Sequence, residues 1–344
     1  MEIRPLGKTG LAVSALGFGC GAVGGLMVRG DAAEQRRTVE TALGAGIRYF
    51  DTAPGYGDGR SEENLGRVLH GLGSVAADVI VGTKVRVDPA TATGPGAGQT
   101  VAHAIRESAE ASLRRLRRER VHLFQLHNRI AFDAAANASG GFTPDQVLGP
   151  VLDGLRAVRD AGMAEHVGIT ATGDPTAVRS VVASGVSETA QVYFNALNPS
   201  AGWPGLGRSG TLSGNDFDGL IDRAAEHGVG VIIIRSLAAG AVAASDVRHA
   251  NAGGAGSGGG ERYEDDLQRA QALSALAADL GFEGPVELAL RFALSKPGVS
   301  TVIVGFSNLA QLTDALRWAE RGALPGDALE RVLDLHRPTS HPGH

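Results

Sequence analysis

The stretch Tyr49-Phe50-Asp51-Thr52-Ala53-Pro54-Gly55-Tyr56-Gly57 decides how this chain folds. Its first, apolar residues predict a short buried strand, and the proline and glycines after Asp51 predict a loop. This places an acid at a strand tip and a tyrosine shortly after it. Two later strand-like runs, 78–85 and 121–127, also carry polar side chains at or near their ends. The four residues expected at or just past strand ends are Asp51, Tyr56, Lys84 and His127.

Strand-like and helix-like segments alternate along the rest of the chain, after an expected hairpin over residues 2–13. This alternation favours a (β/α)8 barrel, as a single domain over residues 1–344, with a doubly wound sheet as the alternative. Apolar runs predict strands at 15–19, 47–51, 79–84, 121–127, 166–170, 190–194, 230–235 and 301–304. Apolar residues at helical spacing predict helices near 32–45, 61–72, 100–118, 144–162, 175–184, 216–227, 263–280 and 308–321, with a further helix-like stretch at 285–294.

The composition argues against several classes of protein. A net charge of -5 gives no reason to expect nucleic acid or an acidic membrane as a partner. No apolar run approaches the ~20 residues that a membrane span needs. Residues 1–10 lack the apolar segment of a signal peptide. Because the one cysteine, Cys20, cannot form an internal disulfide, we expect a cytoplasmic protein.

Two segments rich in glycine and alanine follow expected strands. Residues 250–260 (ANAGGAGSGGG) predict a flexible loop after the seventh strand, at the catalytic end of a barrel. This loop is either an insertion without a role or a flap over a ligand. Residues 133–143 after the fourth strand leave the same choice, and residues 337–344 form a polar tail.

Residues 19–24 (GCGAVG) match the G-x-G-x-x-G pattern of dinucleotide-binding folds. In that fold a helix begins at the glycines, so that its N-terminus meets the pyrophosphate. Here residues 25–30 come before helix-like sequence begins, so a glycine-rich loop with room for a ligand is favoured. No cysteine cluster, HExxH or GxSxG motif occurs, so the sequence supports neither a metal site nor a serine hydrolase.

The four polar residues at the strand ends form a coherent chemical set. A free tyrosine has a pKa of ~10 and is a poor proton donor or acceptor at neutral pH. The ammonium of Lys84 would favour the phenolate of Tyr56 and lower its pKa, and Asp51 would hold that ammonium charged. His127 would hydrogen-bond and orient a carbonyl oxygen. Such a site protonates a C=O, and because no side chain supplies hydride, it implies a nicotinamide cofactor.

The segments that carry these residues resemble the aldo-keto reductase family over nearly the whole chain. The resemblance implies a (β/α)8 barrel with an N-terminal hairpin and a cofactor extended across its C-terminal face. It also implies that Tyr56 is the proton donor, that Lys84 and Asp51 tune it, and that His127 orients the substrate. The matching segments are LGFGCGAVG (16–24), FDTAPGYGDGRSEENLG (50–66), VGTKV (81–85), VHLFQLHN (121–128), HVGIT (166–170), QVYFNAL (191–197) and IVGFSNLAQL (303–312).

The resemblance also assigns residues to the cofactor. Thr170 and Gln191 match the positions that bind the carboxamide, although the usual asparagine after the first is Ala171 here. NADP(H) is favoured by the family, but NAD(H) is a rival. The reason is that Gln311 stands where a basic residue often binds the 2′-phosphate, and an uncharged side chain binds a phosphate less strongly. The carboxylate of Asp314 would also repel the 2′-phosphate. The residues expected at the cofactor are Cys20, Gly21, Thr170, Gln191, Arg235, Leu237, Ala239, Gly305, Phe306, Ser307, Gln311 and Asp314.

In the family, an aromatic residue at the end of the seventh strand usually stacks under the nicotinamide ring. Here the chain is IIRSLAAG (233–240), and two ways of counting place either Ile234 or Arg235 at that position. Because a strand alternates its faces, one of the two points into the mouth. We favour Arg235, whose planar guanidinium can stack on a ring. Its positive charge would disfavour the cationic, oxidised cofactor.

The sequence therefore predicts an oxidoreductase that transfers hydride between a nicotinamide cofactor and a small carbonyl or alcohol substrate, with Tyr56 as general acid and base. An NAD-dependent aldose dehydrogenase is the alternative in the same class, and a non-catalytic nicotinamide-sensing barrel is the alternative in another. Phe132 and Trp203 are candidate walls of the substrate pocket. The low aromatic content, 5%, favours small aldehydes or sugars over steroid-like substrates.

Overall fold

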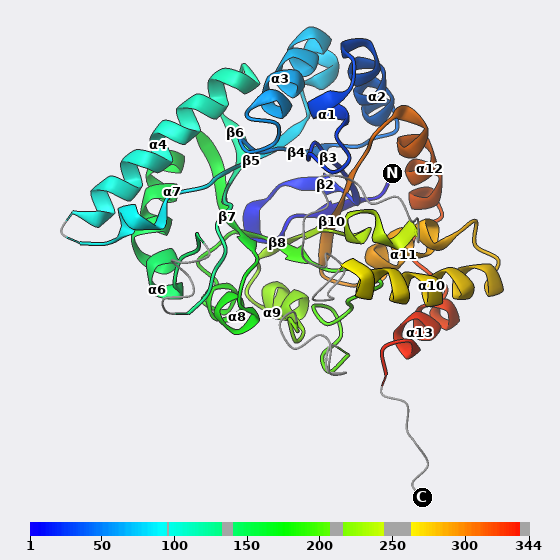
Figure 1. Ribbon diagram of the computed structural model, residues 1–344. Coiled ribbons are helices and arrows are strands. Elements are labelled where there is room, and N and C mark those ends of the chain that lie inside the picture. The colour runs from blue at the N-terminus through cyan, green and yellow to red at the C-terminus, as the bar shows by residue number, and fades with distance from the viewer. Residues whose placement is uncertain (95, 133–139, 207–215, 244–262, 338–344) are drawn as a thin grey trace, which may run out of the picture.

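The computed structural model describes residues 1–94, 96–132, 140–206, 216–243 and 263–337. An antiparallel hairpin of β1 (Ile3–Pro5) and β2 (Ala12–Ser14), joined by the 3-10 turn η1 (Gly7–Thr9), opens the chain. Parallel strands then close into a barrel in the order β10-β3-β4-β5-β6-β7-β8-β9 (Figure 1). The barrel and hairpin confirm the predicted fold and exclude the doubly wound sheet. The barrel strands are β3 (Leu16–Gly19), β4 (Tyr49–Asp51), β5 (Ile80–Val85), β6 (Val121–Leu126), β7 (Ala164–Ala171), β8 (Thr189–Tyr193), β9 (Gly230–Ile234) and β10 (Val299–Gly305).

Helices follow the barrel strands and surround them (Figure 1). Among the described residues, no helix is both long and apolar enough to cross a membrane. The helices are α1 (Leu26–Arg29), α2 (Ala32–Gly44), α3 (Arg60–Leu72), α4 (Ala97–Leu116), α6 (Pro144–Gln146), α7 (Leu152–Asp160), α8 (Pro175–Ala183), α9 (Leu220–Glu226), α10 (Tyr263–Asp279), α11 (Pro285–Ser295), α12 (Leu309–Glu320) and α13 (Gly326–Asp334). Shorter turns are η2 (Gly73–Ala76), η3 (Pro89–Ala92), η4 (Val147–Val151) and η5 (Ala238–Ala243).

One expected helix, 144–162, is interrupted. It begins with a capping box, in which the Thr143 hydroxyl accepts from the Gln146 N–H and the Gln146 side chain accepts from the Thr143 N–H. The chain then passes through the π-helical turn η4 before α7 begins. The reason is Pro150, which lacks an N–H and whose ring crowds the preceding turn. Helices α1 and α13 are additions to the elements that the sequence predicted.

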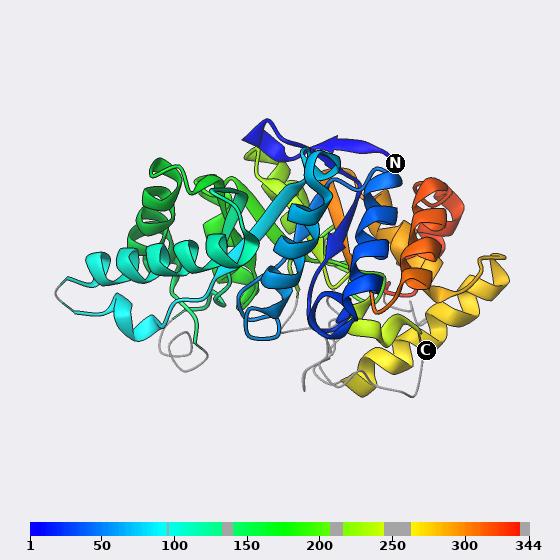
Figure 2. The ribbon, with the colours of Figure 1, turned by 90° about the horizontal axis from the view of Figure 1, so that it is seen from above.

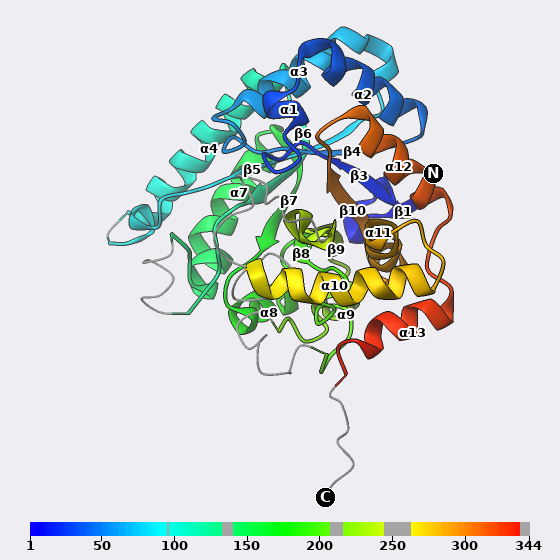
Figure 3. The same ribbon diagram turned by 45° about the vertical axis from the view of Figure 1, so that its right-hand side comes forward.

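The hairpin closes the end of the barrel at which the strands begin (Figure 2). Leu6 and Val13 are fully buried and pack with Ile232 inside the barrel. The Lys8 N–H donates to the Gly228 carbonyl at 2.8 Å, just before β9. At the other end, α10 packs against η5 and lies beside α11 and α13 (Figure 3). With one end plugged, the carboxyl ends of the strands form the open end, where such barrels place their sites.

Strand β4 shows how side chains divide between the inside of the barrel and the surrounding helices. Phe50 points outward and stacks on Phe18 with ring centroids 5.1 Å apart. Tyr49 belongs to the cluster inside the barrel, and Asp51, two residues later, shares its face. The alternation therefore directs the carboxylate of Asp51 into the open end.

The segments 250–260 and 338–344, for which the sequence predicts a flexible loop and most of a polar tail, lie outside the described residues.

Candidate active site

The structure brings Asp51, Tyr56 and Lys84 together at the open end of the barrel. Lys84 Nζ donates to Asp51 Oδ2 at 2.5 Å and to the carbonyl of Thr52 at 2.9 Å, and it lies 3.3 Å from Tyr56 Oη. The Lys84 and Asp51 side chains are only 1% and 5% exposed. Because a buried charge without its partner is costly, this ion pair holds both groups in place.

His127 follows β6 and faces the same phenol. Its ring centroid lies 5.9 Å from that of Tyr56, with the two ring planes at 88°. Burial, together with the positive charges of Lys84 and Arg86, lowers the pKa of His127 to about 3. The imidazole is therefore neutral at neutral pH, and its one N–H can donate a hydrogen bond. A carbonyl oxygen beside the Tyr56 hydroxyl would be within the reach of both groups.

The loop that carries Tyr56 is fixed by its own backbone and by its neighbours. The Gly59 N–H donates to the Pro54 carbonyl at 2.8 Å, and the Ser61 N–H donates to the Tyr56 carbonyl at 3.2 Å. The Ser61 hydroxyl donates to the carbonyl of Cys20 at 2.8 Å, which ties the loop to the end of β3. Gly59 has a φ of 88°, a conformation that favours glycine. The phenol is thus held on an ordered turn.

The electrostatics of Tyr56 differ in one respect from the sequence expectation. Burial raises the pKa of Tyr56, and the negative charge of Asp51 raises it further. The positive charge of Lys84 lowers this pKa but does not outweigh the other two effects, so the pKa of Tyr56 lies above its usual value. For Lys84, burial lowers the pKa, but Asp51 and Tyr56 outweigh burial and the pKa rises. The phenol therefore carries its proton at neutral pH, as a donor to a carbonyl requires. The ammonium beside it would stabilise a phenolate at Tyr56.

Thr170 and Gln191 are paired in register on β7 and β8, and both are buried. The Thr170 hydroxyl has no hydrogen-bond partner among the described residues. A buried polar atom without a partner costs free energy, so this hydroxyl fits a ligand contact. Gln191 Nε2 donates to Asp51 Oδ1 at 2.5 Å. This hydrogen bond links the position predicted for the carboxamide to the carboxylate that pairs with Lys84.

The turn after β9 has an unusual backbone. Ile234 packs against the cluster inside the barrel and takes the inward face of the strand. Arg235 follows the strand with a φ of 57°, so strand alternation does not decide its direction. Its charge, like that of Lys84, acts against the rise that burial causes in the pKa of Tyr56. Ala238 and Ala239, with φ values of 49° and 54°, are also non-glycine residues in the left-handed region, and such strain is often stored at ligand sites. Arg235, Leu237 and Ala239 stay predicted cofactor contacts.

The segment 305–314 leaves β10 and enters α12. The Asn308 side chain accepts from the Gln311 N–H at 3.0 Å, and the Gln311 side chain accepts from the Ser307 N–H at 2.8 Å. Asp314 is paired with Arg317 at 2.8 Å, which offsets its negative charge. The exposed start of a helix suits a phosphate group.

Cys20 and Phe306 direct their side chains into the core rather than into the mouth. Both are only 1% exposed, and the Phe306 ring packs on Phe18 with centroids 5.1 Å apart. The Cys20 N–H donates a hydrogen bond to the Asp51 carbonyl at 2.9 Å. Gly21 instead faces the site, since a Cβ there would lie 3.8 Å from the Tyr56 ring. All of these remain predicted cofactor contacts, together with Gly305, which is exposed at the end of β10.

Phe132 and Trp203, predicted to line the substrate pocket, have different settings. Phe132 is 45% exposed in the segment after β6, the strand that precedes His127. Trp203 packs against Phe292 of α11, with centroids 5.3 Å apart, and Lys296 Nζ lies 5.4 Å from its ring. Trp203 therefore packs against an outer helix, whereas the exposed ring of Phe132 is accessible to a ligand. Both assignments stay predictions.

Residues 15–336 match the model of the Aldo/keto reductase family. The chain belongs to this family. It is 29% identical to L-galactose dehydrogenase from Arabidopsis thaliana over 320 residues, 91% of this chain and 86% of that protein. It is 27% identical to D-threo-aldose 1-dehydrogenase from Pseudomonas sp over 334 residues, 90% of each chain. The solved aldo-keto reductase AKR11C1 from Bacillus halodurans, in its holo form, has a TM-score of 0.71 at 22% identity, covering 100% of this chain and 99% of that one.

Sequence reasoning missed two polar residues of this aldo/keto reductase. Tyr49 Oη donates to Asp51 Oδ1 at 3.1 Å, from inside the barrel. Asn128 accepts from the Val87 N–H at 2.9 Å and donates to the Val87 carbonyl at 2.7 Å, which joins the segments after β5 and β6. Strand alternation is a signal that could have revealed Tyr49, because it is two residues from Asp51.

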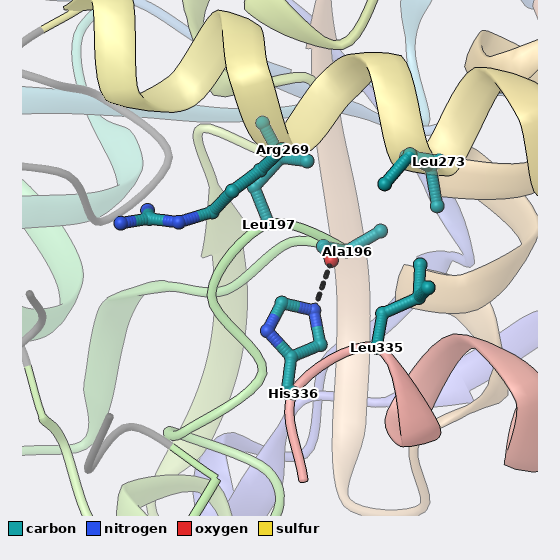
Figure 4. A pocket seen from close by; sticks show the side chains of 7 residues that line it. Ala196, Leu197, Arg269, Leu273, Leu335 and His336 are labelled. Atoms are coloured by element: carbon teal, nitrogen blue, oxygen red, sulfur yellow. Dashed lines mark hydrogen bonds between the residues drawn. The ribbon is translucent and has the colours of Figure 1, made fainter. Parts of the chain in front are cut away.

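A cavity of about 100 Å³ lies apart from the catalytic group, between α10, the segment after β8 and the end of α13 (Figure 4). His336 Nε2 lies 2.8 Å from the Ala196 carbonyl at its edge. None of Asp51, Tyr56, Lys84 and His127 lines this cavity, so it is separate from the candidate active site. Its lining residues are Ala196, Leu197, Arg269, Ala272, Leu273, Leu335 and His336.

Proposed function

We propose that this aldo/keto reductase transfers hydride between a nicotinamide cofactor and a carbonyl or alcohol group of a small molecule, with Tyr56 as general acid and base. One observation carries the proposal. Lys84 Nζ lies 2.5 Å from the Asp51 carboxylate and 3.3 Å from the Tyr56 hydroxyl, at the open end of the barrel. Burial beside a specific charge partner shifts the pKa of a side chain, and such shifts are typical of groups that transfer protons.

In carbonyl reduction, the Tyr56 hydroxyl donates its proton to the carbonyl oxygen as the carbonyl carbon becomes bonded to hydrogen. A nicotinamide cofactor, when bound, would supply that hydrogen as hydride. The Lys84 ammonium stabilises the resulting phenolate, and Asp51 holds the ammonium in position. Neutral His127 donates a hydrogen bond to the same oxygen and orients it. In alcohol oxidation the Tyr56 phenolate accepts the hydroxyl proton.

The residues present fit a nicotinamide cofactor. The buried Thr170 hydroxyl, without a partner among the described residues, suits an amide, and the start of α12, which Asn308 caps, suits a phosphate. NADP(H) is our first choice because it is typical of the family, and the pairing of Asp314 with Arg317 weakens the objection to a 2′-phosphate. Dissociation constants for both cofactors test this. NAD(H) binding as tightly as NADP(H), or more tightly, would overturn the choice.

The relatives favour sugars as a narrower substrate class. L-galactose dehydrogenase and a D-threo-aldose 1-dehydrogenase are both similar over about nine tenths of this chain. Oxidation of an aldose requires the same proton transfer, from a hydroxyl to the Tyr56 phenolate. We therefore propose aldoses as the first alcohols to test, beside small aldehydes as carbonyls. We also propose that the protein is cytoplasmic.

The test is turnover by the purified protein with both cofactors over a panel of aldoses, aldehydes and ketones. Tyr56→Phe should lose roughly 10²–10⁴-fold in kcat, because that is the usual contribution of general acid–base catalysis. Its affinity for the cofactor should stay unchanged, since the phenol donates only in the transition state. A Tyr56→Phe variant with normal kcat would refute the role of Tyr56. Tight cofactor binding without any turnover by the wild type would favour a nicotinamide sensor.

A further inference from the structure

A second tyrosine lies below the catalytic carboxylate, inside the barrel. Tyr49 is fully buried, and its hydroxyl donates to Asp51 Oδ1 at 3.1 Å. Gln191 donates to the same oxygen at 2.5 Å, and Lys84 donates to Oδ2 at 2.5 Å. Three side chains from three strands therefore hold this carboxylate, and one of them, Lys84, also contacts the Tyr56 hydroxyl.

The neighbouring strands leave room for the Tyr49 phenol. A Cβ on Gly82 of β5 would lie 2.6 Å from Tyr49 Oη, and a Cβ on Gly17 of β3 would lie 3.1 Å from Tyr49 Cδ1. The first distance is shorter than real Cβ atoms show, so a side chain at Gly82 would displace the hydroxyl. Glycine on both sides thus allows the phenol to reach Asp51 across the interior of the barrel.

The Tyr49 hydroxyl keeps its proton. Burial raises the pKa of Tyr49, and the charge of Asp51 raises it further. A protonated phenol is a permanent donor to the carboxylate, and a hydrogen bond to an ionised group is stronger than one between neutral groups. The negative charge of Asp51 raises the pKa of Tyr56 and so disfavours the Tyr56 phenolate. Because the Tyr49 hydroxyl donates to Asp51, it reduces the negative charge that Tyr56 experiences.

We propose that Tyr49 is a positioning residue of the catalytic site: its hydroxyl fixes Asp51 from inside the barrel and weakens the negative field that reaches Tyr56. This inference rests on the proposed role of Tyr56. Without the hydroxyl, Asp51 exerts a stronger negative field, and the Tyr56 phenolate is harder to form. The effect acts through Asp51, so it vanishes when Asp51 is uncharged.

Other charged and titratable groups surround the same centre on neighbouring elements, and Tyr49→Phe alters none of these side chains. A change in the ionisation of Tyr56 in Tyr49→Phe therefore reports the lost hydroxyl. These groups are Cys20 after β3, Lys84 on β5, Arg86 after β5, His127 after β6 and Arg235 after β9.

The experiment measures the ionisation of Tyr56 directly, without turnover. The chain has only four tyrosines, so carbon NMR of protein labelled at tyrosine Cζ can follow each phenol through a pH titration. The variants are Tyr49→Phe, which keeps the ring, and Thr301→Val as a matched control. Thr301 is buried inside the barrel against Gly17, and its hydroxyl has no partner among the described residues. The pH profile of alcohol oxidation is recorded in parallel.

In Tyr49→Phe the titration of Tyr56 should move to higher pH, with on the order of tenfold less phenolate at a fixed pH, as one pKa unit implies. The basic limb of the oxidation profile should move with it, and Thr301→Val should change neither. In an Asp51→Asn background, adding Tyr49→Phe should cause no further shift, as a double-mutant cycle requires. An unmoved Tyr56 titration in Tyr49→Phe, an equal shift in Thr301→Val, or a shift that persists with Asp51→Asn would each overturn the inference. Failure of the proposed function is recognised separately, by turnover that survives Tyr56→Phe.

Discussion

Replacing Lys84 by methionine should separate the proposed catalytic role of the ammonium from its structural role. Methionine keeps much of the length of the side chain and removes the charge. With an effective dielectric constant of about 20, unit charges at the 3.3 Å between Lys84 Nζ and Tyr56 Oη interact by about 5 kcal/mol. This is an upper bound on what the ammonium gives to the phenolate, because the Asp51 carboxylate opposes it.

The same change also affects stability. Asp51 is 5% exposed at its side chain and would lose the donor at 2.5 Å, which leaves Tyr49 and Gln191 as its side-chain donors among the described residues. Removing one partner of a buried ion pair typically costs ~3–5 kcal/mol. Adding Asp51→Asn to Lys84→Met should recover much of that loss, because the carboxylate no longer carries an unpaired charge. The double variant should not recover turnover.

The assay is kcat with saturating cofactor and substrate, together with urea unfolding of each variant. We expect kcat to fall roughly 10²–10⁴-fold in Lys84→Met and in the double variant, the range of general acid–base catalysis. Cofactor dissociation constants serve as the control for an intact site. The reasoning would be refuted by a double variant that regains wild-type kcat, or by a folded Lys84→Met variant that keeps kcat within a few-fold of the wild type.

Three further predictions follow from the site and the fold. The pKa of His127 is about 3 in the folded chain against ~6.5 when unfolded, so the unfolded state binds this proton first and stability falls as the pH drops from about 6.5 toward 3. His127→Asn should flatten that part of the melting-temperature profile, and an equally steep decline would contradict the assignment. Arg235→Ala should weaken binding of the reduced cofactor more than of the oxidised one, measured by calorimetry; equal losses would return the stacking position to Ile234. Thr143→Ala removes a capping box and should cost ~1 kcal/mol in urea unfolding, whereas an unchanged midpoint would show that the cap does not stabilise the fold.

The sequence by itself determined the order of the elements and the end of the barrel at which the predicted catalytic residues lie. Apolar runs and helical spacing are local properties, so they placed the strands and most helices without knowledge of the fold. Asp51 at the end of β4 and Lys84 near the end of β5 could be predicted to meet, because the carboxyl ends of parallel strands converge on one face. The family segments then assigned the remaining roles as expectations.

Tertiary structure decided what depends on closure of the barrel and on distances between side chains. Gln191 is 140 residues from Asp51 in the chain, and only the joined strands bring their polar atoms to 2.5 Å. The direction of the Tyr56 pKa followed from burial, which outweighs the neighbouring ammonium and which a linear pattern does not measure. The contact between the Trp203 ring and Phe292 of the outer helix α11 was likewise visible only in the tertiary structure. A sequence specifies which groups lie at strand ends, but the register of the closed sheet and the exclusion of water set their charges, hydrogen-bond partners and directions.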